Sequence, residues 1–401
     1  MTSALGKPYQ WLIIAGVVVA VVAVLVLGRE QTALPGNLSD GTVVATLGPV
    51  SKPYPEGLRA AVKRARETPT NRDAAYAAAS AYLDYGREIG DARYVGAALG
   101  VLEPWLVTSP DAQILNLAAS GRQYTHDFAG AISLLDQVLS ANPRNAQALL
   151  SRANIRIVQG DFPAAEEDCR GLARARRADL AILCDTTAKA LTAEAPLAFD
   201  RLNRLIETRA MDPGLMAYAD GLLAEIARFQ GKTDIAKQKF EAAHASSPED
   251  LRTLMILVDF DLAEGRPQDA LAKMSAAPVT DAIMVRQVEG HLATGNTAEA
   301  DRIGNVLRGQ FAEAITAGDT AHAREASRYW LAVGESRQAL EAATANWTNQ
   351  RELEDALLFL KSAVAAGNPA AADTVVEWAA KNSVVAPMYQ AALKQFEAAS
   401  R

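Results

Sequence analysis

The sequence is poor in the residues that build metal sites, β-sheets and nucleic-acid interfaces. Its 401 residues include 2 cysteines and 4 histidines, and these form no zinc-type cluster. Aromatic residues make up 6%, and the region after residue 56 is short of the valine and threonine that a β-sandwich needs. The formal net charge is −7, whereas a nucleic-acid binder carries a basic surface. No phosphate-binding glycine loop or nucleophile elbow appears. We therefore expect an all-α protein with no enzymatic activity, no cofactor, no metal and no nucleic-acid partner.

One long apolar run without charge lies near the N-terminus. Residues 11–28 read WLIIAGVVVAVVAVLVLG, and at about 1.5 Å per residue this run nearly crosses a hydrocarbon layer of about 30 Å. The alternative is a cleaved signal peptide, whose apolar core is usually shorter and ends at a small-x-small site. The best such site here, Val26-Leu27-Gly28, is a poor one. We expect a single transmembrane helix in the lipid bilayer, preceded by a short tail at residues 1–10.

The charges that flank this run set the expected topology. Lys7 and the terminal amine lie on one side and Arg29 on the other, which slightly favours a cytoplasmic N-terminus. The body would then lie outside the cytoplasm, on the periplasmic side of an inner membrane. Residues 29–56 are rich in Pro, Gly, Ser and Thr, and this composition predicts an extended linker between membrane and body.

The rest of the chain shows an internal period. Six helix-breaking glycines precede apolar stretches at steps of 71, 34, 30, 39 and 33 residues: Gly160, Gly231, Gly265, Gly295, Gly334 and Gly367. An alanine follows each glycine by five residues: Ala165, Ala236, Ala270, Ala300, Ala339 and Ala372. One unit earlier, His126 takes the place of the glycine and Ala131 follows at the same offset. Such a period is typical of stacked helical repeats.

These residues resemble the tetratricopeptide-repeat family, which stacks pairs of antiparallel helices every 34 residues. The segments from Gly231 to Pro248 and from His126 to Pro143 match its second helix and terminator well. Small alanines would permit close helix crossings, and glycine would accept the left-handed turn. Asp161, Thr233 and Asn368 are expected to cap second helices. Arg152 and Asp220 depart from the pattern, because the family has large apolar residues at these places.

The resemblance implies an α-solenoid of helical hairpins. We expect the repeats to occupy residues 57–385, with about nine helix pairs between residues 72 and 386 and a capping helix over residues 386–401. The pairs near residues 180–216 and 285–319 match the family poorly, and we expect them to distort the superhelix. The spacing of Cys169 and Cys184 would place them opposite one another across a hairpin. Two interpretations stay open, a disulfide in an oxidising compartment or two buried thiols.

The resemblance also implies a concave face lined by first helices, which receives a peptide or a helix. Carried over by position, ten residues would line it: Asn116, Ser120, Gln123, Tyr124, Asn154, Ile157, Val158, Glu225, Arg228 and Phe229. The sequence therefore predicts a membrane-tethered scaffold or assembly factor that binds a protein or peptide partner. The alternative is a structural subunit of an oligomeric envelope complex, such as secretion, cytochrome-maturation or polysaccharide-export machinery, in which the chain would form a homo-oligomer. A third hypothesis is an enzyme subunit whose active site comes from its partner.

Overall fold

The computed structural model describes residues 55–399 except 210, 212 and 319, and these residues belong to one compact unit. The predicted tail (1–10), transmembrane helix (11–28) and linker (29–56) lie outside the described residues, apart from the last two linker positions. All regular elements in the described part are helices. Among them, none combines the length and the apolar character that crossing a membrane requires.

The helices follow one another in antiparallel hairpins from α3/α4 to α19/α20, nine pairs in the described residues, with α2 before them and α21 after them. In chain order they are α2 (Glu56–Glu67), α3 (Arg72–Ile89), α4 (Ala92–Thr108), α5 (Ala112–Tyr124), α6 (Phe128–Ala141), α7 (Ala146–Val158), α8 (Phe162–Arg174), α9 (Ala178–Lys189), α10 (Ala195–Thr208), α11 (Pro213–Phe229), α12 (Thr233–Ser246), α13 (Leu251–Ala263), α14 (Pro267–Lys273), α15 (Asp281–Ala293), α16 (Thr297–Ala317), α17 (Ala323–Ala332), α18 (Ser336–Trp347), α19 (Leu353–Ala365), the 3-10 helix η1 (Pro369–Ala372), α20 (Asp373–Lys381) and α21 (Pro387–Ala399). The predicted all-α solenoid of hairpins is confirmed.

The turns within the hairpins use a left-handed residue, as the glycine period predicts. All six glycines of that period have φ between 66° and 80°, a conformation that costs glycine little. His126, which replaces the glycine in the α5–α6 turn, has φ 60°. The α9–α10 turn has no such residue among its described positions. This is the weakly matching pair near residues 180–216.

The periodic alanines lie where the two helices of a hairpin touch. Each is at most 3% exposed, from Ala131 in α6 to Ala372 in η1, so a larger side chain at these positions would push the helices apart. The expected caps are correct only in part. The Asp161 side chain accepts the N–H of Ala164 at the start of α8. Thr233 is instead the first residue of α12, and Asn368 makes no side-chain cap bond.

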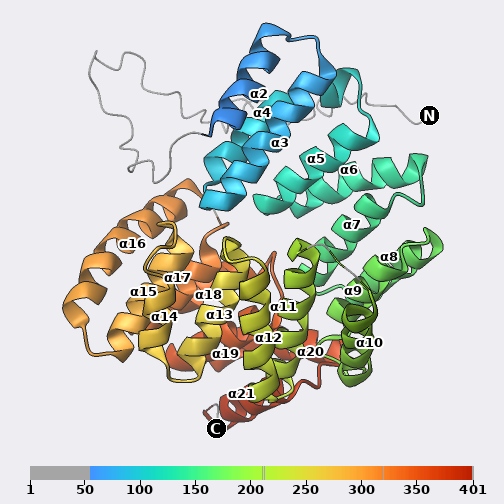
Figure 1. Ribbon diagram of the computed structural model, residues 1–401. Coiled ribbons are helices and arrows are strands. Elements are labelled where there is room, and N and C mark those ends of the chain that lie inside the picture. Colours follow the sequence, from blue (N-terminus) through green and yellow to red (C-terminus); the bar gives the residue numbers. More distant parts are fainter. Residues whose placement is uncertain (1–54, 210, 212, 319, 400–401) are drawn as a thin grey trace, which may run out of the picture. The chain divides into compact units, whose positions relative to one another are not determined.

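The hairpins form two layers, because from α11 to α19 each first helix contacts the next first helix. Thus α11 contacts α13, α13 contacts α15, α15 contacts α17 and α17 contacts α19. The second helices, such as α12 and α16, lie on the outside of this row (Figure 1). The row curves, so that the chain comes back on itself. The first helices therefore form the inner wall of a superhelix.

The superhelix closes where the C-terminal hairpins reach α7–α9. The backbone N–H groups of Val385 and Ala386 both donate to the carbonyl oxygen of Leu191. The indole of Trp378 lies against Gly160, so closely that a Cβ at Gly160 would come within 2.3 Å of its Nε1 atom. One apolar cluster runs across this junction, from Phe162 to Trp347. We call this junction the seam.

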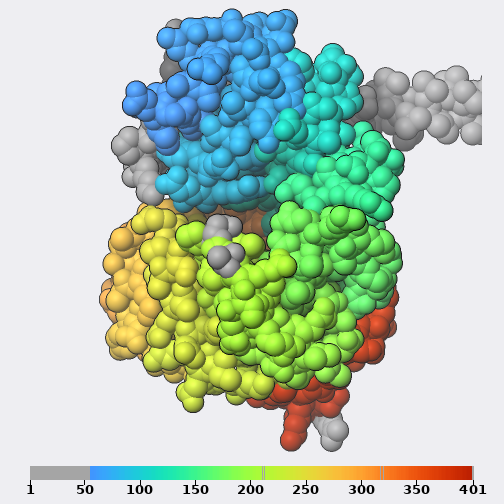
Figure 2. All heavy atoms as spheres, turned by 45° about the vertical axis from the view of Figure 1, so that its right-hand side comes forward, coloured from blue at the N-terminus to red at the C-terminus, as the bar shows by residue number. Residues whose placement is uncertain are grey.

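The first hairpins lie on top of the superhelical turn that the seam closes, which we call the closed turn (Figure 2). Gly90, in the α3–α4 turn, meets Thr280 just before α15 and Leu251 at the start of α13. Helices α3–α6 thus begin a second level of the superhelix above α13 and α15 (Figure 1). A side chain at Gly90 would both clash with Thr280 and strain the backbone, because its φ is 68°.

Candidate functional site: a chamber on the inner face

The closed turn surrounds a cavity of about 550 Å³, which we call the chamber. Most of its wall comes from the first helices α11, α13, α15, α17 and α19, and residues of α7–α9 complete it at the seam. Cavities of this size typically hold a small ligand or a few side chains of a partner.

The helical repeat explains which residues face the chamber. On α13 the lining residues include Arg252, Ile256, Asp259 and Ala263, which recur every three or four positions and so share one face of the helix. On α17 the charged lining residues precede the apolar Leu331, whereas on α11 the apolar Leu222 precedes the charged ones. The wall thus combines a group of charged residues, which we call the belt, with apolar residues such as Leu222, Leu331 and Leu357, which we call the apolar floor.

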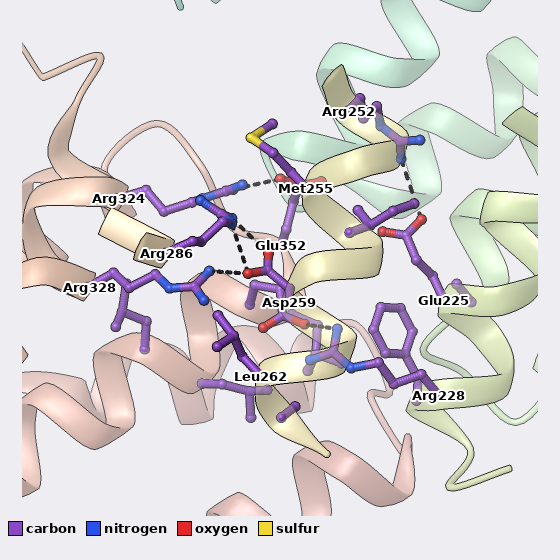
Figure 3. Close-up of a pocket in the computed structure, with 18 of the residues that line it drawn as sticks. Glu225, Arg228, Arg252, Met255, Asp259, Leu262, Arg286, Arg324, Arg328 and Glu352 are labelled. Carbon is purple, nitrogen blue, oxygen red and sulfur yellow. Dashed lines mark hydrogen bonds and ion pairs between the residues drawn. The ribbon is translucent and has the colours of Figure 1, made fainter. Parts of the chain in front are cut away.

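The belt is built around Asp259 (Figure 3). Its carboxylate accepts hydrogen bonds from Arg286 on α15, at 2.8 and 2.7 Å, and forms an ion pair of 2.6 Å with Arg328 on α17. Burial alone would raise the pKa of Asp259, but the two guanidinium groups lower it to about 2. Arg328 also binds both carboxylate oxygens of Glu289. Three neighbouring first helices are thereby joined through charge-assisted hydrogen bonds.

A second group of charges lies at the start of α19. Arg324 donates to both oxygens of the buried Asp355, at 2.6 and 2.7 Å, and to Glu352 at 2.6 Å. Although burial opposes it, these carboxylates hold the pKa of Arg324 well above its usual range. Asn346 donates to Asp355 as well. Every oxygen of Asp355 is thus occupied, which is the condition for keeping a carboxylate in a protein interior.

Two carboxylates of the chamber have weaker partners. Glu225 on α11 has an ion pair of 3.4 Å with Arg252, and Glu325 on α17 has one of 3.9 Å with Arg286. Burial raises the pKa of both groups. A third, Glu354, forms an ion pair of 2.8 Å with Arg228 and keeps nearly half of its side chain exposed. Acceptor capacity therefore remains on this part of the wall.

The structure distributes the ten predicted groove residues over two regions. Four of them line the chamber: Ile157, Glu225, Arg228 and Phe229. The others lie on α5 and α7 away from the chamber: Asn116, Ser120, Gln123, Tyr124, Asn154 and Val158. Among the latter, the Ser120 hydroxyl accepts from Arg87 at 2.6 Å, and the carbonyl of Val158 accepts from the N–H of Arg351 at the seam. The chamber thus includes four of the ten residues, and the other six lie outside its lining.

Sequence reasoning missed most of the belt. Asp259, Arg286, Arg324, Arg328 and Asp355 received no role, although each stands in an otherwise apolar or alanine-rich first helix. A charge on the inner face of such a helix was the available signal. It was not enough alone, because the partners lie in other hairpins. Within the described residues, no group of three or more potential ligands could hold a metal ion.

The two cysteines are joined next to the chamber wall. Cys169 on α8 and Cys184 on α9 form a disulfide with a Cα–Cα distance of 5.4 Å, and both are buried. The bond connects two helices that both contribute to the seam. Native disulfides of this kind occur mainly in oxidising compartments.

Comparison with known proteins agrees with this architecture. Residues 124–182, from the end of α5 into α9, match the tetratricopeptide repeat family model. No curated protein sequence matches the chain. Among solved structures, a chain of the APC/C hetero-tetramer Cut9–Hcn1 is similar at 13% identity and a TM-score of 0.50, over 85% of this chain and 66% of that one. This chain thus spans just under two thirds of that relative.

Two further solved structures are similar to smaller degrees. Yeast Tom70 has 12% identity and a TM-score of 0.37, over 85% of this chain and 84% of that chain. The TPR domain of P58(IPK) has 12% identity and a TM-score of 0.23, over 80% and 98% of the two chains. The match of residues 124–182 to the tetratricopeptide repeat model lies within a body that has a tetratricopeptide-like solenoid fold.

Proposed function

We propose that the protein is a membrane-tethered interaction scaffold that holds a segment of a partner protein inside the chamber. The observation that carries this proposal is an amphipathic cavity of about 550 Å³ on the inner face of the solenoid, the face that helical-repeat proteins use for binding. The belt would fix the orientation of the bound segment, and the apolar floor would supply most of its binding free energy.

The closed ring around the chamber favours a particular way of binding. An open groove accepts a long extended peptide, but here the seam closes the inner face into a ring through Leu191, Val385 and Ala386. A segment that enters such a ring does so by a chain end or a loop tip. The partner is therefore expected to contribute a short segment of a few side chains.

The tether and the compartment complete the proposal. The uncharged run at residues 11–28 is long enough for one membrane passage. The disulfide between Cys169 and Cys184 supports a body outside the cytoplasm, where such bonds persist.

Fractionation tests the tether: we expect the full chain in the membrane fraction after alkaline carbonate, and release by carbonate would contradict it. Protease added to spheroplasts should degrade the body, whereas full protection would place the body in the cytoplasm.

Site-specific photo-crosslinking tests the scaffold function. A photoreactive amino acid replaces Ile256, which lines the chamber, and in a matched variant it replaces Ala312, which is exposed on the outer helix α16. After irradiation of native membranes, mass spectrometry maps the attached partner peptide. We expect one short segment attached at position 256 and not at 312. Adducts at 312 with none at 256 would place the binding surface outside the chamber.

A further inference from the structure

The hydrogen bonds within the chamber are unequally distributed between its cations and its anions. Arg286, Arg324 and Arg328 each bind a carboxylate with two nitrogen atoms, and each has a further carboxylate or carbonyl partner. Guanidinium groups in this state have few donors left for a ligand. The donors on this side of the chamber are therefore used within the wall.

Carboxylates on the opposite side are not saturated in this way. Glu225 has one contact, at 3.4 Å from Arg252, whose own side chain is 49% exposed and lies over the ring of Tyr218. Glu354 has one contact, with Arg228. Each carboxylate offers about four acceptor positions. Helices α11 and α19 thus present acceptor positions that the contacts with Arg228 and Arg252 do not fill, although Lys361 of α19 also lines the chamber.

The charges around Glu225 also indicate that its carboxylate can accept a further cation. Burial raises its pKa, Arg252 and Arg228 lower it, and the nearby Glu352 and Glu354 carboxylates raise it further. Two or more carboxylates that face one cavity repel each other, and the pKa of Glu225 stays raised although Arg252 and Arg228 lie beside it. Apolar residues adjoin this point, with Leu222 and Phe229 on α11 and Leu353 on α19.

We propose that the partner segment held in the chamber carries a basic side chain, lysine or arginine, that binds at Glu225 and Glu354, with apolar residues beside it on the chamber floor. This inference rests on the proposed function and specifies the chemistry of its partner. The ammonium or guanidinium group donates to the free acceptor positions of the two carboxylates, and it replaces part of the weak contact with Arg252. An acidic segment would find the donors of Arg286, Arg324 and Arg328 already in use, and it would have to compete with Glu225 and Glu354 for Arg252 and Arg228 or bind Lys361.

Selection from a randomised peptide library tests the proposal. The full chain, reconstituted in nanodiscs, is exposed to random octapeptides, and retained peptides are sequenced. The wild-type protein should enrich lysine and arginine next to Leu, Phe, Ile or Val. For one such selected peptide, Glu225→Gln should weaken the Kd about tenfold, since a charge-assisted hydrogen bond to a half-buried group contributes on this scale.

Two further variants test the same contact if Glu225→Gln alters the fold. Arg252→Gln removes the one partner of Glu225 and should tighten binding of the same peptide about threefold or more. Glu341→Gln, on the exposed face of α18, is the matched control and should leave the Kd unchanged. The melting temperature of each variant reports whether it is folded.

The outcomes separate this inference from the proposed function. Retained peptides without basic enrichment, or an equal Kd for wild type and Glu225→Gln with no tightening by Arg252→Gln, would overturn the basic-residue proposal and leave the scaffold in place. Peptides that bind but do not attach to a photoreactive residue at position 256 bind elsewhere, and this result would overturn both. Retention of no peptide by the wild-type protein would also count against both.

Discussion

The backbone N–H of Arg351 donates a hydrogen bond of 2.7 Å to the carbonyl oxygen of Val158. Val158 ends the first helix of the third hairpin and Arg351 lies just before the ninth hairpin of the described chain, so the bond spans a full turn of the superhelix. It occupies a carbonyl at the C-terminal end of α7 that would otherwise need water. Together with the bonds to Leu191 it makes the inner face a ring, and this ring surrounds the chamber.

Truncation of Trp378 should open the seam. Trp378 packs on Gly160, Phe162 and Trp347, so Trp378→Ala removes the aromatic contact between the two ends of the turn. We expect the free energy of unfolding to fall by about 3–5 kcal/mol and the radius of gyration of the folded protein to rise in small-angle X-ray scattering. Trp330→Ala is the control, because Trp330 is equally buried but lies in the α15–α18 cluster. Trp330→Ala should lower the free energy of unfolding by a similar amount without raising the radius of gyration. An equal rise in the radius of gyration of both variants would mean that the seam does not close the ring.

Reduction of the disulfide should destabilise the body. Cys169 and Cys184 are separated by 15 positions, and closing a loop of this length contributes about 3 kcal/mol by restricting the unfolded chain. Urea denaturation with and without dithiothreitol measures the loss. The double variant Cys169→Ala, Cys184→Ala should be insensitive to dithiothreitol. Full labelling of both thiols in the native, unreduced protein would show that the bond is absent.

Removal of the Asp259 charge should be costly and dependent on pH. Asp259→Asn leaves Arg286 and Arg328 without a shared carboxylate, and breaking a buried ion pair of this kind costs about 3–5 kcal/mol. The folded pKa of about 2 lies below the unfolded value. The stabilisation is therefore complete above about pH 4 and is lost as the pH falls towards 2. Urea denaturation of both proteins at pH 6 and pH 3 should show the difference shrinking at pH 3; a constant difference would contradict the ion pairing.

Neutralising Glu325 should have the opposite effect. Burial raises the pKa of Glu325, and Arg286 at 3.9 Å offsets only part of this penalty. A raised folded pKa means that stability is complete below the unfolded pKa and is lost as the pH rises through the folded value. Glu325→Gln should therefore have a higher melting temperature than wild type at pH 7 and an equal one near pH 4. The exposed Glu341→Gln variant should show no change at either pH, and a destabilised Glu325→Gln would mean that the charged form has a partner in the wall.

The sequence predicts contacts between neighbours in the chain far better than contacts across the ring. Ala131, Ala165 and Gly160 could be placed because each hairpin repeats the same local contact at the same offset. The position of Trp378 against Gly160 has no such repeat. It depends on the summed rotation of seven hairpins, including the short α14 and the long α16. A small error in each rotation moves the ends of the turn apart.

Charged residues that depart from the repeat pattern also show that the sequence predicts contacts across the ring poorly. Arg152 and Asp220 stand where the family has apolar residues, and the structure pairs Arg152 with Asp136 and Asp168 and pairs Asp220 with Lys239. Each pair lies within a hairpin or between adjacent hairpins. The pair of Arg324 with Asp355 also joins adjacent hairpins, but its role in the chamber depends on the ring. Sequence alone therefore identified a concave face and not the belt within it.

The most direct test of the chamber as the binding site is to fill it. Ala332→Trp places an indole on the chamber side of α17, and Ala312→Trp places the same group on the exposed surface of α16. The measured quantity is the Kd of a library-selected peptide for each folded variant, by fluorescence anisotropy. We expect at least tenfold weaker binding for Ala332→Trp and no change for Ala312→Trp. Wild-type affinity in a folded Ala332→Trp protein would contradict this expectation.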